Sequence, residues 1–180
     1  MPVRDIRDYA FVEADHLLLD TNILMFVYGP QKQNDKRCED YTDAFKRMCQ
    51  GKSVLYIDVL IMSEFINRCT RLEMQLRKHK DYKKFRNSED FRSIAQGIAS
   101  NVRRIGQYTT RTNSPFQECP LDQMLYEFEA GQVDFNDQML LQLCRNKNLM
   151  LVTDDGDCTS NDVTILTANS RLLELSGTIP

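Results

Sequence analysis

Short apolar runs alternate with helical patterns along this chain, and this alternation constrains the fold more than any other feature. The apolar runs cover residues 17–20, 54–58, 149–153 and 163–167. Apolar residues at helical spacing cover 35–50, 58–77, 88–107, 121–130, 135–146 and 170–175. Strands that alternate with helices form a parallel sheet, because each helix returns the chain to the edge where the next strand starts. The sequence therefore predicts an α/β fold, a three-layer α/β/α sandwich around a central parallel sheet.

The length and composition indicate one folded domain. The chain has 180 residues, of which 42% are hydrophobic, and this is enough to bury a core. We expect a single domain over 1–180, with a longer basic helical region at about 68–130. Within it, the charged stretch 77–86 is expected to be a helix break or an exposed hinge.

No part of the sequence predicts a membrane protein. No apolar run approaches the roughly 20 residues that a transmembrane helix needs, and the first 16 residues are too charged for a secretory signal. We expect a cytoplasmic protein with no membrane partner. The six cysteines are scattered without a CxxC pair and there are only two histidines, so a zinc site of ordinary spacing is not expected.

Acidic side chains follow the predicted strands or open the helices next to them. In a parallel sheet the strands end at one edge and the crossover helices begin there, so these positions converge at that edge. The acids predicted to lie there are Asp20, Glu64, Asp137, Asp154, Asp155 and Asp157. Carboxylate oxygens without histidine or cysteine are typical ligands of Mg²⁺ or Mn²⁺, which activate water and bind phosphodiesters.

Each acid also has an ordinary structural interpretation. Asp20 could form a turn or cap a helix, and Glu64 stands four residues before Arg68, at the spacing of a helical ion pair. Asp134 and Asp137 are acceptable at a helix start, where the helix dipole favours acids. The segment TDDGD could be a simple turn. Only their joint placement at one edge favours a metal site.

The positive charge is concentrated in one region. Residues 68–111 contain 12 of the 23 lysines and arginines but only 4 of the 26 acids. Lys83, Lys84, Arg103, Arg104 and Arg111 could form a surface that tracks RNA phosphates beside the acidic cleft. The alternative is a solvated helix face, which is the commoner role of such charge runs.

Three segments carry a resemblance to a known family. They are "LLLDTNILM", "VLIMSEFI" and "DFNDQMLLQLCRNKNLMLVTDDGDC". With them the sequence resembles the PIN domain, and within it the VapC-type ribonuclease toxins of bacterial toxin–antitoxin modules. The resemblance implies an α/β/α sandwich and an endoribonuclease that needs Mg²⁺ or Mn²⁺ and leaves 5′-phosphate and 3′-hydroxyl ends. It also implies a homodimer and a small antitoxin protein as partner.

The resemblance also assigns roles to residues. It implies that the four acidic metal-site residues are Asp20, Glu64, Asp137 and Asp155, with Asp157 as an accessory acid. Supporting positions are Asn22 and Thr153, and less constrained acidic or polar positions are Asp134 and Asp154. The chain departs from compact toxins in its extra length between Glu64 and Asp137, which includes the basic region.

Two other classes of function stay open at this stage. One is a PIN-like scaffold that binds RNA or a protein partner without cutting. The other is a phosphotransfer protein with Asp20 as phosphoacceptor, either a haloacid dehalogenase-type phosphatase or a receiver domain. The phosphatase pattern D-x-D-x-T is not matched, because Asn22 and Leu24 stand at its last two positions. A receiver needs an acid pair after the first strand and a lysine at a late strand end, and residues 163–167 end in no lysine.

Overall fold

The computed structural model describes residues 2–30, 35–131 and 134–177, and the other ten residues lie outside this description. Its six strands form one sheet in the order β1-β6-β5-β2-β3-β4, and every pairing is parallel. The strands are β1 (Val3–Asp5), β2 (His16–Leu19), β3 (Val54–Ile57), β4 (Thr110–Arg111), β5 (Met150–Val152) and β6 (Ile165–Thr167). The predicted parallel sheet is confirmed.

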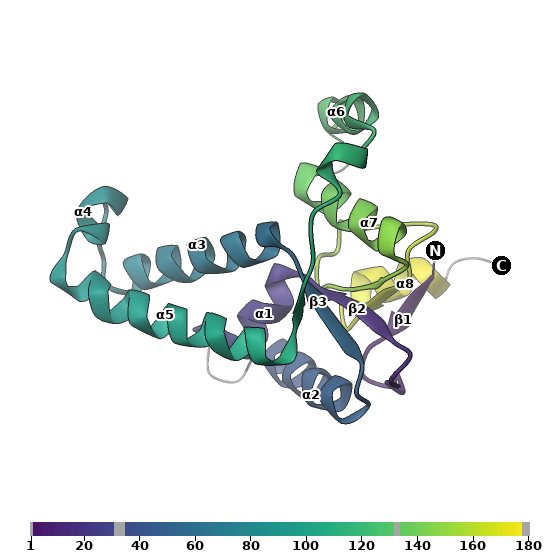
Figure 1. Ribbon diagram of the computed structural model, residues 1–180, viewed down its shortest axis with the longest axis horizontal. Coiled ribbons are helices and arrows are strands. Elements are labelled where there is room, and N and C mark those ends of the chain that lie inside the picture. The colour runs from purple at the N-terminus through teal and green to yellow at the C-terminus, as the bar shows by residue number, and fades with distance from the viewer. Residues whose placement is uncertain (1, 31–34, 132–133, 178–180) are drawn as a thin grey trace.

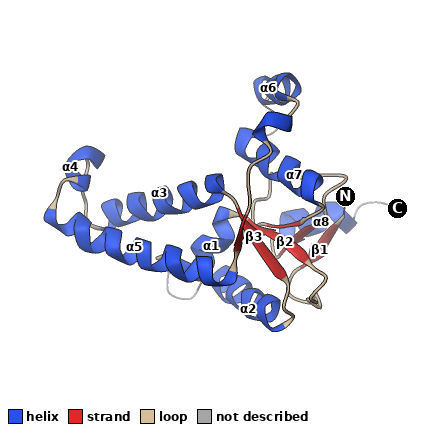
Figure 2. Cartoon of the chain, in the orientation of Figure 1, coloured by secondary structure: helices blue, strands red, loops and turns tan. Residues whose placement is uncertain are grey.

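Eight α-helices are present in the described part of the chain (Figures 1 and 2). They are α1 (Thr21–Tyr28), α2 (Lys36–Gln50), α3 (Val59–Leu76), α4 (Tyr82–Arg86), α5 (Glu89–Tyr108), α6 (Leu121–Glu129), α7 (Phe135–Lys147) and α8 (Ser170–Gly177). A short 3₁₀ helix covers Phe116–Glu118. Among these described residues no helix is both long and apolar enough to cross a bilayer.

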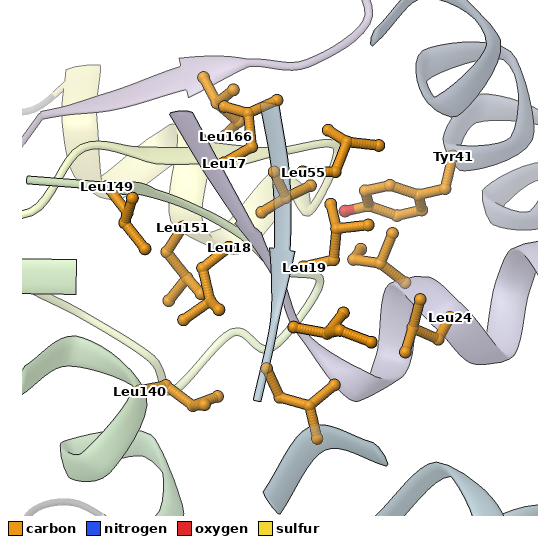
Figure 3. Packing of buried hydrophobic residues seen from close by; sticks show 14 of the residues in the cluster. Leu17, Leu18, Leu19, Leu24, Tyr41, Leu55, Leu140, Leu149, Leu151 and Leu166 are labelled. Carbon is orange, nitrogen blue, oxygen red and sulfur yellow. The ribbon is translucent and has the colours of Figure 1, made fainter. Parts of the chain in front are cut away.

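Helices cover both faces of the sheet, so the three-layer sandwich is confirmed. The three leucines of β2 are fully buried, as expected for a central parallel strand that is covered on both sides. Figure 3 shows Leu18 turned toward Leu140 of α7, whereas Leu19 lies with Leu24 of α1 and Tyr41 of α2 on the other side. Successive side chains of a strand point to opposite faces, so β2 contributes to both halves of the core.

Two helices extend well beyond the sheet. In Figure 1, α3 and α5 run side by side away from the sheet, with α4 at their far end. The two long helices pack against each other, and α1 contacts both of them. The helix break expected within residues 77–86 is present after α3, where Lys78 has a positive φ of 58°. The short helix α4 follows it, and its start is capped by Asp81.

Candidate functional site

A cavity of about 860 Å³ opens at the edge of the sheet where the strands end. Six acids line it: Asp20, Glu64, Asp134, Asp137, Asp155 and Asp157. They come from the end of β2, from α3, from the start of α7 and from the loop after β5. On one side of β2 the sheet continues to β3 and β4, and on the other to β5 and β6. Ligands of open α/β sheets bind at such a reversal of strand order, outside the carboxyl ends of the strands.

Asp20 is buried and held by three hydrogen-bond donors. Its Oδ1 accepts from the Thr21 backbone N–H at 2.5 Å, and its Oδ2 accepts from Asn22 Nδ2 at 2.5 Å and Thr153 Oγ1 at 2.6 Å. Asp20 is also the N-cap of α1, so the capping interpretation of this residue is confirmed. These hydrogen bonds fix the carboxylate at the carboxyl end of β2, where it lines the cavity.

Burial raises the pKa of Asp20 to about 6. The hydrogen bonds from Thr153 and Thr21 act in the opposite direction, and the charges of Glu64 and Asp155 raise the pKa further. The donors therefore favour the carboxylate, while its buried and acidic surroundings favour the neutral acid. A cation in the cavity would stabilise the charged carboxylate and so lower its pKa.

Thr153 and Asn22 connect the two central strand ends. The Thr153 hydroxyl donates to Asp20 and accepts from Asn22 Nδ2 at 3.1 Å and from the Asp155 backbone N–H at 3.0 Å. Asn22 Oδ1 accepts from the Asp154 backbone N–H at 3.0 Å. The two side chains expected to support the acids therefore lie between Asp20 and the loop after β5, and they fix one relative to the other.

Asp137 lies in the first turn of α7 and faces the other acids. Burial raises its pKa to about 7, and the negative charges of Asp155, Asp20, Asp134 and Glu64 contribute in that order. These acids line one cavity, as expected for residues at one edge of the sheet. Asp134 itself caps α7, because its Oδ1 accepts from a backbone N–H in the first turn.

Glu64 forms the helical ion pair that its spacing suggested, and it also lines the cavity. Its Oε1 lies 3.5 Å from Arg68 Nη1, the expected helical ion pair, and its Oε2 accepts from Thr21 Oγ1 at 3.1 Å. The side chain is 41% exposed and lines the cavity. An exposed ion pair of this kind contributes little to stability, so it leaves Glu64 available to a ligand.

The acids after β5 divide into two groups. Asp155 and Asp157 line the cavity, and Asp155 Oδ1 accepts from the Asp157 backbone N–H at 2.9 Å. Asp154 does not line it: its buried carboxylate accepts from the Tyr41 hydroxyl at 2.8 Å and lies 3.4 Å from Arg37. The expectation that all three acids share one site is wrong for Asp154, because successive residues of the extended chain point in opposite directions.

Two arginines line the cavity, Arg68 and Arg171. Arg171 lies 2.8 Å from the Asp157 carboxylate. Sequence reasoning missed Arg171 as a site residue, since its position depends on how α8 packs against the sheet and no local spacing signals that.

The five basic residues singled out from the sequence are not among the residues that line the cavity: Lys83, Lys84, Arg103, Arg104 and Arg111. The two lysines lie on α4, at the far end of the α3–α5 pair (Figure 1). The arginines lie near the end of α5 and on the edge strand β4. The length of α5 therefore lies between the two lysines and the three arginines, and a role of these residues in RNA binding stays a prediction.

The donor set fits a hard divalent cation in its chemistry, since it consists of carboxylate oxygens that repel one another. The positions of these side chains in the structure are a separate question from their chemistry. In the ranges 2–30, 35–131 and 134–177, no group of three or more His, Cys, Asp or Glu side chains is arranged so that it could hold a metal ion. A preformed coordination shell is thus not present among the described side chains.

No protein-family model matches the chain, and no curated protein matches it. Among solved structures, it is similar to the crystal structure of PAE2754 from Pyrobaculum aerophilum, with a TM-score of 0.51. The two chains are 16% identical, and the similarity covers 97% of this chain and 98% of that one. At this level of identity the similarity supports the fold alone.

Proposed function

We propose that this protein is a metal-dependent endoribonuclease of the PIN-domain type, which hydrolyses RNA phosphodiester bonds with Mg²⁺ or Mn²⁺. The observation that carries the proposal is that six carboxylates from four segments of the chain line one cavity at the strand ends. The raised pKa values of Asp20 and Asp137 support it, since negative charge gathered without enough cations is typical of an acidic metal centre.

In this proposal the ion is held by Asp20, Glu64, Asp137 and Asp155, with Asp157 as an accessory acid. A bound ion would supply positive charge for the phosphodiester and lower the pKa of water to near neutrality. The chain's own contribution is to position these acids. Thr153 and Asn22 hold Asp20 by hydrogen bonds, and Thr153 also holds the backbone of Asp155.

The proposal extends to partners and location. The RNA substrate would be cut in the cytoplasm by the toxin of a toxin–antitoxin pair, with an antitoxin protein and a second copy of the chain as partners. Exposed apolar side chains on α3 and α6 support protein contacts in general: Val59, Ile66, Leu76, Leu121, Leu125, Tyr126 and Phe128.

A second candidate is a PIN-like scaffold that binds RNA or a protein partner without cutting. The observation that favours it is that the described acids form no group ready to hold an ion. A phosphatase or receiver domain is less favoured by the geometry. Both oxygens of Asp20 already accept hydrogen bonds, and the side-chain amide of Asn22 is used for contacts with Asp20, Thr153 and Asp154.

The experiment that tests the proposal is cleavage of a pool of cellular RNAs by wild type and Asp20→Asn, with Mg²⁺, Mn²⁺ or EDTA. Asp154→Asn is the matched control, because it changes a buried acid one residue from Asp155 that does not line the cavity. We expect cutting by wild type and by the control in either metal, and none by Asp20→Asn or in EDTA. Binding of RNA without cutting by all three proteins would favour the scaffold.

A further inference from the structure

The loop that follows β5 carries Asp155 and Asp157 into the cavity, and its backbone is held from two sides. On the side of β2, Asn22 Oδ1 accepts from the Asp154 backbone N–H at 3.0 Å. On the side of β6, Asn169 Nδ2 donates to the Asp154 backbone carbonyl at 2.7 Å. Since β5 lies between β2 and β6 in the sheet, the loop is tied to the ends of both neighbouring strands.

Asn169 is itself fixed between β6 and α8. It is partly buried, and its backbone N–H donates at 3.0 Å to Oγ1 of Thr167, the last residue of β6. Its Oδ1 accepts from the Arg171 backbone N–H at 3.0 Å, which is the hydrogen bond of an N-cap at the start of α8. The capping oxygen and the amide donor belong to one side chain. The start of α8 and the loop after β5 are therefore joined through Asn169.

The start of α8 also packs directly against the acidic loop. A Cβ atom at Gly156 would lie 3.3 Å from Arg171 Cδ and 3.4 Å from Asn169 Nδ2, so the two segments are in close contact. Arg171 also lies 2.8 Å from the Asp157 carboxylate, but both side chains of this ion pair are exposed. Exposed ion pairs contribute little to stability. The partly buried hydrogen bond of Asn169 is therefore the stronger restraint on the loop.

We propose that Asn169 is a positioning residue, which holds the loop after β5 and thereby fixes Asp155 relative to Asp20. The inference rests on the proposed function and adds a residue to it. Asn169 does not line the cavity, so it acts through the backbone of Asp154. Without its amide the loop keeps the hydrogen bond to Asn22 but loses the one to the start of α8. The acids of the loop then occupy a wider range of positions, and groups that orient metal ligands typically change metal affinity by about 10–100-fold.

The test separates the two roles of the Asn169 side chain. Asn169→Ser and Asn169→Thr keep an oxygen that caps α8 but remove the amide that donates to Asp154. Asn101→Ser is the matched control. Asn101 is also partly buried, its Nδ2 donates to the Tyr28 backbone carbonyl at 2.8 Å, and it does not line the cavity. Urea unfolding of every variant distinguishes a general loss of stability from a local effect on the loop.

Two measurements report on the loop in the folded protein. Hydrogen exchange of the metal-free protein, followed by NMR, monitors the backbone N–H groups of Asp155, Asp157 and Cys158, which donate to acceptors within the loop. Calorimetry measures the affinity for Mn²⁺ at pH 7.

We expect both Asn169 variants to exchange these amides about tenfold faster and to bind Mn²⁺ at least about tenfold more weakly than wild type. Asn101→Ser should match wild type in both measurements. A wild-type value of either quantity in the Asn169 variants would overturn the inference, and so would equal losses in Asn101→Ser or the absence of Mn²⁺ binding by wild type. Failure of both Asn169 variants to fold would show a merely structural role and would overturn it as well.

The same preparations separate this inference from the proposed function. If Asn169→Ser exchanges faster and binds Mn²⁺ more weakly while wild type and Asp20→Asn cut RNA equally, the positioning role stands and the metal-dependent nuclease fails. If Asp20→Asn loses cleavage while both Asn169 variants match wild type in exchange, Mn²⁺ affinity and cleavage, the nuclease stands and the positioning role fails.

Discussion

Asp20 is subject to two opposing influences at once. Its burial raises its pKa, and the three hydrogen bonds that it accepts hold it as a carboxylate. For Asp137, burial and the neighbouring carboxylates all raise the pKa, which reaches about 7. A divalent cation that binds these acids near neutral pH therefore competes with protons, most of all at Asp137.

The first prediction concerns the metal affinity of individual acids. We expect Asp155→Asn to weaken Mn²⁺ binding at pH 7 by at least about tenfold, since even outer partners of metal ligands cost that much. Asp154→Asn should bind Mn²⁺ like wild type, because its carboxylate is engaged by Tyr41 and does not line the cavity. Isothermal titration calorimetry measures both. Equal affinity of wild type and Asp155→Asn would remove Asp155 from the site.

The second prediction concerns pH and stability without metal. The pKa of Asp137 is 3.8 when unperturbed and about 7 when folded, so between these pH values the folded protein holds a proton that the unfolded chain has lost. The free energy of unfolding should therefore fall as pH rises from about 4 to about 7 and then level off. Urea unfolding in EDTA should show a shallower fall for Asp137→Asn than for wild type. Parallel curves for the two proteins would contradict this account.

At the level of elements, β2 and α1 form the support of the site. β2 pairs with β3 on one side and β5 on the other, and its leucines are buried on both faces. The chain then enters α1 without a loop, with Asp20 as the only residue between strand and helix. A displacement of either element would thus move Asp20 relative to Asp155.

The third prediction tests this support. Leu18→Ala should lower the free energy of unfolding by about 2–5 kcal/mol, because it leaves a cavity where the leucine packs toward α7. Leu76→Ala is the control, since Leu76 is 64% exposed near the end of α3 and its loss should change stability by less than about 0.5 kcal/mol. Chemical unfolding measures both. Similar stability of the two variants would contradict the packing described for β2.

Most elements could be predicted from the sequence because their own residues specify them. The four apolar runs became strands and six helical patterns became helices, with ends shifted by one or two residues. β1 and β4 were missed because they are short edge strands with polar side chains, and only their neighbours in the sheet identify them. α1 was missed because its run of apolar residues, Ile23–Phe26, has no helical periodicity.

At the level of the whole molecule, the order of the strands brings together acids that are far apart in the sequence. Asp20 and Asp155 are 135 positions apart in the sequence, and the parallel pairing of β2 with β5 places both at the same edge. That part of the site was predictable, because parallel topology alone determines it. The places of Arg171 and Asn169 were not, since they depend on how α8 packs.

The most direct test of the central claim is the chemistry of the ends that cleavage leaves on RNA. Wild type and Asp20→Asn are incubated with a defined single-stranded RNA and Mn²⁺, and the termini of the products are determined. The account predicts 5′-phosphate and 3′-hydroxyl ends from wild type and no products from Asp20→Asn, because an ion held by the carboxylates would activate water as the nucleophile in place of the RNA 2′-hydroxyl. Products with 2′,3′-cyclic phosphate ends, or equal cutting by Asp20→Asn, would contradict it.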